Sequence, residues 1–256
     1  MIIDTHAHYD DEAFEDDREE LICGLYSKGI ERVVNVGASM DSSRRTLELI
    51  RQYDCVYGAI GVHPTETENM TEKDLEWLKQ ACSQPKVVAW GEIGLDYYWD
   101  EPKREIQKEW FVRQLNAARE VKLPVIIHSR DAAKDTLDLM KAENAGEIGG
   151  VIHCFSYGTE MAREYLDMGF SLGIGGVVTF QNAKKLKEVV EYAPLTSLVL
   201  ETDCPYLTPV PYRGKKNHSG YLPYVVEEIA RLKKITTEEV VDVTKENAMR
   251  LYRWNK

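Results

Sequence analysis

Residues 87–92, Val-Val-Ala-Trp-Gly-Glu, and residues 123–128, Leu-Pro-Val-Ile-Ile-His, are two short apolar runs that each end in a polar side chain. Between them, residues 103–121 have the apolar spacing of an amphipathic helix. Continuous apolar runs of this length are typical of parallel strands that are covered on both faces. The stretch therefore predicts a strand, a helix and a parallel strand, which is the repeating unit of an α/β fold.

The same alternation continues in both directions along the chain. The predicted strands are residues 1–5, 32–37, 56–62, 87–92, 123–128, 150–154, 170–174 and 198–202. The predicted helices are residues 18–28, 42–52, 72–81, 103–121, 132–141, 160–168 and 183–192, with two closing helices near 221–232 and 237–252 after a Pro-rich loop. Eight strand–helix units without a break in composition predict a single (β/α)₈ TIM barrel over residues 1–256. An open, doubly wound sheet is the alternative, because periodicity alone does not show that a sheet closes.

Composition narrows the class of protein. The 256 residues carry 32 Lys and Arg against 43 Asp and Glu, a net charge of −11, and 43% are hydrophobic, which excludes a disordered chain. No apolar run approaches the roughly 18 residues of a membrane span. Five cysteines without a CxxC pair, and a start without an export signal, predict a reduced, cytoplasmic protein. The negative charge argues against tight, sequence-independent binding to duplex DNA, but not against a nucleic-acid enzyme whose site charge comes from metal ions.

Polar residues gather where the predicted strands end. Five of the six histidines lie there, together with three carboxylates; the eight residues are His6, His8, His63, His128, His153, Glu92, Glu201 and Asp203. A single histidine at such a place is more often structural. In a barrel, however, all these strand ends open on one face, where active sites lie. Imidazoles and carboxylates that converge at that face predict a divalent-metal hydrolase, with its metal site at the C-terminal ends of the strands.

The pair His6 and His8 carries specific geometry. Residues two apart on an extended strand point to the same side, so both imidazoles can reach one ion, and Asp203 from the adjacent strand would complete that site. Glu92 can bridge two ions through its two oxygens, while His128 and His153 would hold the second ion. Two ions about 3.5–4 Å apart would clamp a phosphodiester and supply hydroxide near neutral pH.

Several longer motifs resemble those of the TatD family of metal-dependent deoxyribonucleases. They are Asp4-Thr-His-Ala-His8, Gly61-Val-His-Pro64, Gly91-Glu-Ile-Gly-Leu-Asp-Tyr97, His128-Ser-Arg-Asp131, His153-Cys-Phe-Ser156, Gly175-Gly176, Glu201-Thr-Asp-Cys-Pro-Tyr-Leu207 and Glu246-Asn-Ala-Met-Arg-Leu251. The resemblance implies a TIM barrel of the amidohydrolase superfamily and cleavage of DNA from the 3′ end, supported by two Mg²⁺ or Mn²⁺ ions. Zn²⁺ or Ni²⁺ could also occupy the site. The metal residues that it implies are His6, His8, Glu92, His128, His153 and Asp203.

The chain departs from the family pattern in two places. Tyr157-Gly158 stands where the family has Gly-Ser, and His218-Ser-Gly220 stands where it has Glu-Pro-Ala. We expect both departures to lie in substrate loops, so they affect substrate preference more than the metal site.

Other residues have weaker assignments. Asp203 is expected to act as general base as well as ligand, and His63 either contacts the scissile phosphate or orients a ligand; with Glu92 they are the predicted catalytic residues. Arg130, Arg213, Lys215 and Lys216 suit phosphate contacts, although a solvated loop is the slightly favoured explanation for the last three.

The remaining side chains near the predicted site have structural interpretations. Tyr97, Tyr98 and Trp99 could stack on bases, but packing at the barrel rim is the favoured reading. Cys154 and Cys204 are expected to be buried, inert thiols, because alternation along a strand turns them away from the ligands beside them. The role of Glu201 is open.

Three functions compete at this point. The first is a deoxyribonuclease that acts on single-stranded or frayed DNA ends. Such a protein is expected to be a monomer and to have no membrane partner. The second is an amide or ester hydrolase, including one that deacylates aminoacyl-tRNA; the carboxylated Lys common in such enzymes is replaced here by Glu92. The third is a binding protein without turnover, which the presence of all six metal residues disfavours.

Overall fold

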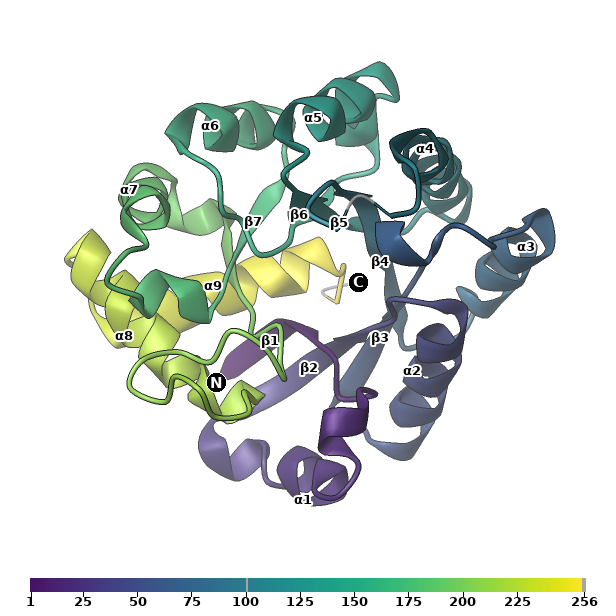
Figure 1. Cartoon of the computed structure of the whole chain (residues 1–256). Coiled ribbons are helices and arrows are strands. Elements are labelled where there is room, and N and C mark those ends of the chain that lie inside the picture. Colours follow the sequence, from purple (N-terminus) through teal and green to yellow (C-terminus); the bar gives the residue numbers. More distant parts are fainter. Residues whose placement is uncertain (100, 255–256) are drawn as a thin grey trace.

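The computed structural model describes residues 1–99 and 101–254 and places them in a barrel of eight parallel strands. The strands are β1 (Ile2–Ala7), β2 (Ile30–Val36), β3 (Val56–Ile60), β4 (Val87–Asp96), β5 (Val125–Arg130), β6 (Gly150–Ile152), β7 (Ser171–Ile174) and β8 (Leu198–Leu200). They pair in chain order, and a bridge between Ala7 and Cys204 joins the two edge strands just beyond β8. Figure 1 shows the resulting ring. The (β/α)₈ prediction is confirmed, and the open-sheet alternative is excluded.

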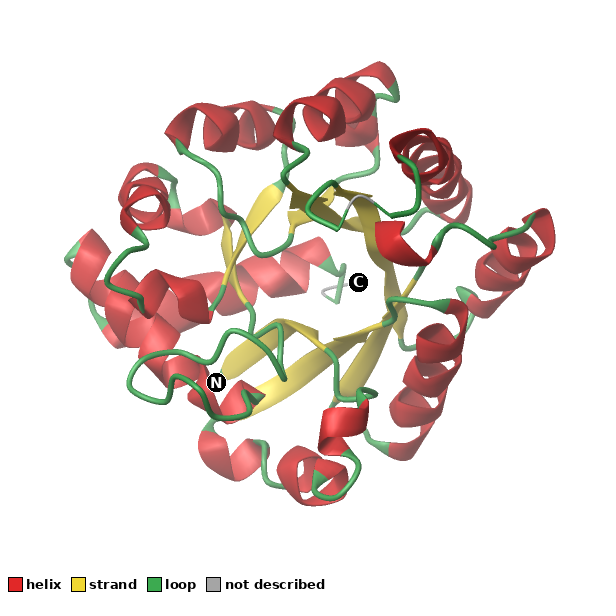
Figure 2. Ribbon diagram, viewed as in Figure 1, coloured by secondary structure: helices red, strands yellow, loops and turns green. Residues whose placement is uncertain are grey.

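Helices surround the strands on the outside of the ring (Figure 2). They are α1 (Arg18–Cys23), α2 (Met40–Gln52), α3 (Glu72–Ala81), α4 (Arg104–Val121), α5 (Ala133–Ala142), α6 (Thr159–Asp167), α7 (Lys184–Tyr192), α8 (Leu222–Lys233) and α9 (Thr237–Leu251). Local chemistry sets some of these ends: Thr71 and Asp74 form a capping box at the start of α3, as the sequence pattern suggests. The predicted helix over residues 18–28 is divided, because α1 ends before a 3₁₀ turn at Tyr26–Lys28.

Apolar residues fill two layers, one between strands and helices and one inside the barrel. The inner layer is made of small and branched side chains: Val34, Val36, Ala59, Val88, Ala89, Ile126, Val151 and Val199. Tyr252, just after α9, packs into this layer, and its hydroxyl donates to the Thr5 carbonyl (2.9 Å). Asn247 of α9 donates to the carbonyl of Leu198 at the start of β8 (2.7 Å). Because α9 thus covers the N-terminal end of the barrel, the C-terminal end is the one left for a site.

Two strand ends differ from the sequence prediction in ways that affect the site. β4 continues to Asp96, so Glu92 lies inside the strand and does not end it. β8 ends at Leu200, so Glu201 and Asp203 belong to the following loop. None of the helices in the described residues is long and apolar enough to cross a bilayer.

Candidate metal centre

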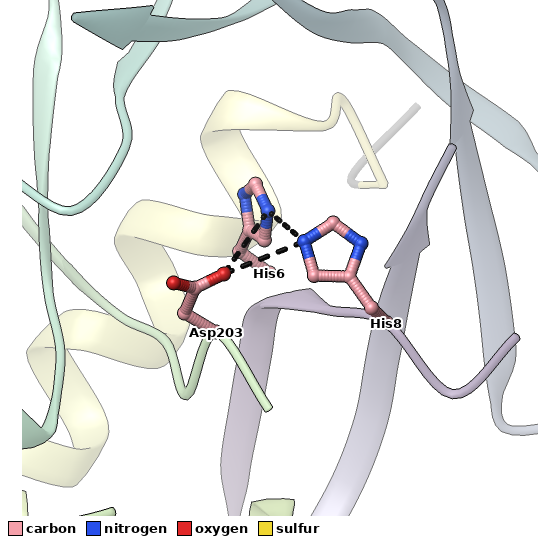
Figure 3. Close-up of side chains that lie close together, drawn as sticks. All are labelled: His6, His8 and Asp203. Atoms are coloured by element: carbon pink, nitrogen blue, oxygen red, sulfur yellow. Dashed lines mark hydrogen bonds and ion pairs between the residues drawn. The ribbon is translucent and has the colours of Figure 1, made fainter. Parts of the chain in front are cut away.

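His6, His8 and Asp203 meet at the C-terminal end of the barrel (Figure 3). The two Nε2 atoms of His6 and His8 lie 3.0 Å apart, as their spacing on an extended segment predicts. Oδ1 of Asp203 lies 3.8 Å from His6 Nε2 and 3.4 Å from His8 Nε2. Three ligand atoms of the kinds that transition metals prefer therefore face one point.

Glu92 lies between this group and a second group of imidazoles. Its Oε2 is 3.4 Å from His6 Nε2, whereas its Oε1 is 2.8 Å from His128 Nδ1. The same Oε1 lies 3.8 Å from His153 Nε2 and 3.9 Å from His63 Nε2. Since each carboxylate oxygen faces a different set of nitrogens, the geometry suits a carboxylate that bridges two ions.

Glycine allows β4 to bring Glu92 close to β5. Gly94 has φ of +146°, and a Cβ at this position would lie 1.9 Å from the carbonyl oxygen of His128. Any larger residue would therefore push the two strands apart. The motif Gly91-Glu-Ile-Gly94 thus places the Glu92 carboxylate within contact of His128 by removing side chains on the β5 side.

Two of the histidines have a hydrogen-bond acceptor at their other ring nitrogen, and a third, His153, faces a carboxylate there. His8 Nδ1 lies 2.8 Å from the Val36 carbonyl, His128 Nε2 lies 3.0 Å from Asp96 Oδ2, and His153 Nδ1 lies 3.2 Å from Glu201 Oε1. A proton held on that nitrogen leaves the opposite nitrogen free to bind a metal, which is the usual support of metal-binding histidines. The side chains therefore fit divalent ions by orientation as well as by chemical type.

Neighbouring imidazoles stabilise the charged forms of the two carboxylates of the cluster. Burial raises the pKa of Glu92, but the charges of His153 and His6 and the hydrogen bond from His128 outweigh it and hold this pKa well below its ordinary value. Burial likewise raises the pKa of Asp203, and the charge of His153 and the hydrogen bond from His8 bring it below its ordinary value. Both carboxylates are therefore ionised at neutral pH.

The imidazoles respond in opposite directions. Burial lowers the pKa of His8 and of His153, but neighbouring carboxylates outweigh it, namely Asp203 for His8 and Glu201 with Glu92 for His153, and raise these values to about 9 and about 10. Burial and the nearby His128 lower the pKa of His63 to about 3, so His63 is neutral.

Binding of a divalent ion is expected to release protons at pH 7. His8 and His153, whose pKa values are raised, each hold an extra proton there, and a nitrogen that carries a proton cannot bind a metal. Affinity should therefore rise with pH up to about 9, by about tenfold per pH unit for each proton displaced. Calorimetric titration with Mn²⁺ in two buffers of different ionisation enthalpy measures the release. A binding heat that does not depend on the buffer would contradict the assignment.

Two functional carboxylates had no role assigned from the sequence. Asp96 is buried and holds His128, and Glu201 is buried and both faces His153 and accepts the Cys154 backbone N–H (2.5 Å). A signal was present: Asp96 follows Glu92 by four residues, an even spacing that can return a side chain to the same face of a strand. Their partners, however, come from other strands and are not evident in the sequence.

The departure at His218-Ser-Gly220 includes a residue with a structural role, whereas its expected place in a substrate loop stays a prediction. Ser219 is buried, and its hydroxyl donates to Asp4 Oδ2 (2.7 Å). Asp4 Oδ2 also accepts from the Thr202 hydroxyl, and its Oδ1 accepts the Thr202 backbone N–H. Ser219 therefore supports a buried network that ties β1 to the residues after β8. At the other departure, the half-buried Tyr157 donates to the Ser129 carbonyl (2.9 Å).

The expectation for Cys154 was wrong in its geometry. Cys154 has a positive φ of 44°, which breaks strand alternation, and its thiol lies in one group with ligand atoms of His153 and Asp203 that are within 4.8 Å of one another. Cys204 is fully buried, as expected, and burial raises the pKa of both thiols well above the ordinary value.

The predicted substrate residues lie at the same end of the barrel with different surroundings. Arg130 stacks on Tyr98, and Arg213 stacks on Phe180, at 3.7 Å and 3.8 Å from the ring centres. Lys215 is exposed beside Tyr212. Lys216 is committed to an ion pair with Asp17 (2.7 Å) and is the least suited of the four to contact a phosphate.

The ligands predicted for the second ion, His128 and His153 with Glu92, do not form one group in the structure. His63, Glu92 and His128 form one group with ligand atoms within 4.8 Å, whereas His153 groups with His6 and Glu201, or with Cys154 and Asp203. His153 Nε2 thus lies between the two groups, 3.7 Å from Asp203 Oδ1 and 3.8 Å from Glu92 Oε1. Its service to a second ion stays a prediction.

The chain is similar to several known proteins. A family model described as TatD related DNase matches residues 3–253. The metal-dependent hydrolase YabD of Bacillus subtilis (strain 168) is 49% identical over 255 residues, covering 100% of both chains. The metal-dependent hydrolase YcfH of Escherichia coli (strain K12) is 36% identical, over 98% of this chain and 96% of that one. The crystal structure of YjjV, a TatD homologue from Escherichia coli K12, superposes with a TM-score of 0.92 at 31% identity and covers 98% of each chain.

Proposed function

The chain belongs to the TatD-related DNase family of metal-dependent hydrolases, and on that premise we propose that it is a deoxyribonuclease that removes nucleotides from the 3′ end of DNA. Its substrate on this proposal is single-stranded DNA or a frayed duplex end. One observation carries the proposal: Glu92 lies between two sets of imidazoles, each facing a different one of its oxygens. Such a site suits in-line displacement at a phosphodiester, in which both the attacking and the leaving oxygen need stabilisation.

We assign two divalent ions to the cluster, Mg²⁺ or Mn²⁺ in function, with Zn²⁺ or Ni²⁺ as possible occupants. His6, His8 and Asp203 would hold one ion, His128 and His153 the other, and Glu92 both. When bound, these ions would neutralise the phosphodiester charge and lower the pKa of the attacking water. Asp203, which is ionised and partly open to solvent, would take the proton of that water.

His63 is assigned to the substrate. Its Nδ1 accepts the backbone N–H of Thr65 (3.3 Å), so in the neutral ring the proton is on Nε2. Nε2 lies 3.9 Å from Glu92 Oε1, so this N–H is next to the cluster. It can therefore donate to an oxygen of the scissile phosphate, which favours substrate contact over service as a ligand through the same nitrogen.

The surroundings of the cluster support a polyanionic substrate. Arg130 is an exposed cation at the end of β5, and Arg213 and Lys215 are exposed cations in the loop after β8, at the same end of the barrel as the cluster. All six proposed metal ligands come from one chain, so we propose a monomer. All five cysteines are free, in keeping with the proposed cytoplasmic location.

A panel of metals and substrates tests the proposal. Single-stranded DNA, duplex DNA, RNA and a carboxylic ester would each be incubated with Mg²⁺, Mn²⁺ or Zn²⁺. We expect fastest hydrolysis of single-stranded DNA, with label lost first from the 3′ terminus. Turnover of the ester, or of an aminoacyl-tRNA, without cleavage of any DNA would replace the proposal by the amide or ester hydrolase.

Removal of the metal is expected to abolish hydrolysis while the fold remains. The barrel has a continuous core, and the imidazoles that face Glu92 and Asp203 stabilise their charged forms. Far-UV circular dichroism of the EDTA-treated protein should match that of the untreated protein, and added Mn²⁺ should restore activity. Global unfolding on EDTA treatment would show that the site is structural.

A further inference from the structure

Two large aromatic side chains stand exposed in the turn after β4. Tyr98 is 56% exposed and Trp99 is 63% exposed, so the expected packing at the rim is wrong for both, although Tyr97 does pack and donates to Asp135 (2.8 Å). The rings of Tyr98 and Trp99 meet edge to face, with centres 5.1 Å apart. The backbone N–H groups of both residues donate to Asp96 Oδ1 (2.9 and 3.3 Å), so these exposed rings are carried by an anchored turn.

This turn is connected directly to the metal centre. Asp96 binds the two N–H groups through Oδ1 and His128 through Oδ2 (3.0 Å). The Asp96 carboxylate therefore links the turn that carries Tyr98 and Trp99 to His128, a predicted metal ligand. Glu92 and Asp96 belong to the same strand, β4, which the turn follows.

Arg130 adds a positive charge to the aromatic pair. Its guanidinium lies 3.7 Å from the centre of the Tyr98 ring, and its carbonyl accepts the Tyr97 N–H (2.9 Å). Within residues 1–99 and 101–254 this guanidinium has no hydrogen bond or ion pair, unlike Lys216. His128 and Arg130 are two apart on β5 and so lie on the same side of that strand.

We propose that Trp99 and Arg130 form a nucleotide-binding subsite for single-stranded DNA, in which Trp99 stacks on a base and Arg130 binds the adjacent phosphate. This inference rests on the proposed function and specifies how the strand reaches the metal centre. An exposed indole offers an aromatic surface on which any base can stack, and a planar guanidinium held on Tyr98 offers donors to phosphate oxygens. Bases of an intact duplex are already stacked on one another, so the occupant is a single strand.

A pair of oligonucleotides isolates the stacking contact. Both are single-stranded and equal in length, and one lacks the bases of its three 3′-terminal nucleotides; terminal phosphorothioate linkages slow hydrolysis while binding to the Mn²⁺-loaded protein is followed by fluorescence anisotropy. Trp99→Ala should weaken binding of the complete strand by about 5- to 100-fold and leave binding of the abasic strand unchanged. Trp99→Phe should restore most of the affinity. Arg130→Gln should weaken both strands and lower the salt slope by about 0.7.

Tyr192→Ala is the matched control, because Tyr192 is an exposed aromatic that ends α7 and so lies toward the opposite end of the barrel. It should change neither affinity. Equal weakening of both strands by Trp99→Ala, or no weakening, would overturn the subsite. Kinetics with ordinary linkages keep the two proposals apart: absence of DNA cleavage by the unmodified protein would refute the nuclease, while the difference in affinity between complete and abasic strands would still decide the subsite.

Discussion

Glu92→Gln is expected to lower the rate of DNA hydrolysis by at least about 10²-fold and to weaken metal binding at both positions. The two oxygens of Glu92 face different nitrogens, His6 Nε2 at 3.4 Å and His128 Nδ1 at 2.8 Å. An amide offers one neutral oxygen and an NH₂ group that repels a cation, so at least one of the two sets loses its shared ligand. Single-turnover rates at several Mn²⁺ concentrations, together with the number of ions bound, measure both effects.

Glu164→Gln is a suitable control for this substitution. Glu164 lies on α6, where it pairs with Lys141 (2.5 Å) away from the cluster, so the same chemical change should leave activity intact. Full activity of Glu92→Gln at saturating metal would remove Glu92 from the mechanism.

Asp203→Asn is expected to reduce turnover of every substrate by about 10²- to 10⁴-fold. The substitution removes a ligand oxygen, 3.4 Å from His8 Nε2, and the proposed proton acceptor in one step. The fold should persist, because Asp203 has φ of +54°, a conformation that Asn adopts readily. A profile of rate against pH separates the two roles: loss of the acidic limb together with kcat indicates the proton acceptor, whereas recovery at high Mn²⁺ indicates the ligand.

Asp131→Asn is the matched control, since Asp131 also has a positive φ (53°) and follows β5 at the same end of the barrel. It should retain activity close to that of the unmodified protein. If Asp203→Asn retained such activity too, Asp203 would be neither ligand nor base.

The sequence by itself determined the number and order of the strands and the end of the barrel at which the site lies. Buried parallel strands need continuous apolar runs, and such runs are local in the chain. The relation of His6 to His8 was equally predictable, because two residues on one extended segment share a side whatever surrounds them. Strand ends were less predictable, since β4 continues to Asp96 through pairing with β5.

Only the tertiary structure decided which partners support the ligands. Asp96 holds His128, 32 residues away along the chain, and Glu201 faces His153 from 48 residues away. Only the tertiary structure also showed that Ser219 is buried against Asp4, and that Trp99 is exposed although aromatic residues usually pack. Such contacts depend on how strands from distant parts of the chain are brought together when the barrel closes. The sequence pattern indicates which side chains share a face of one strand or helix, but not which side chains of different elements come into contact. It therefore predicts the ligands but not the groups that orient them.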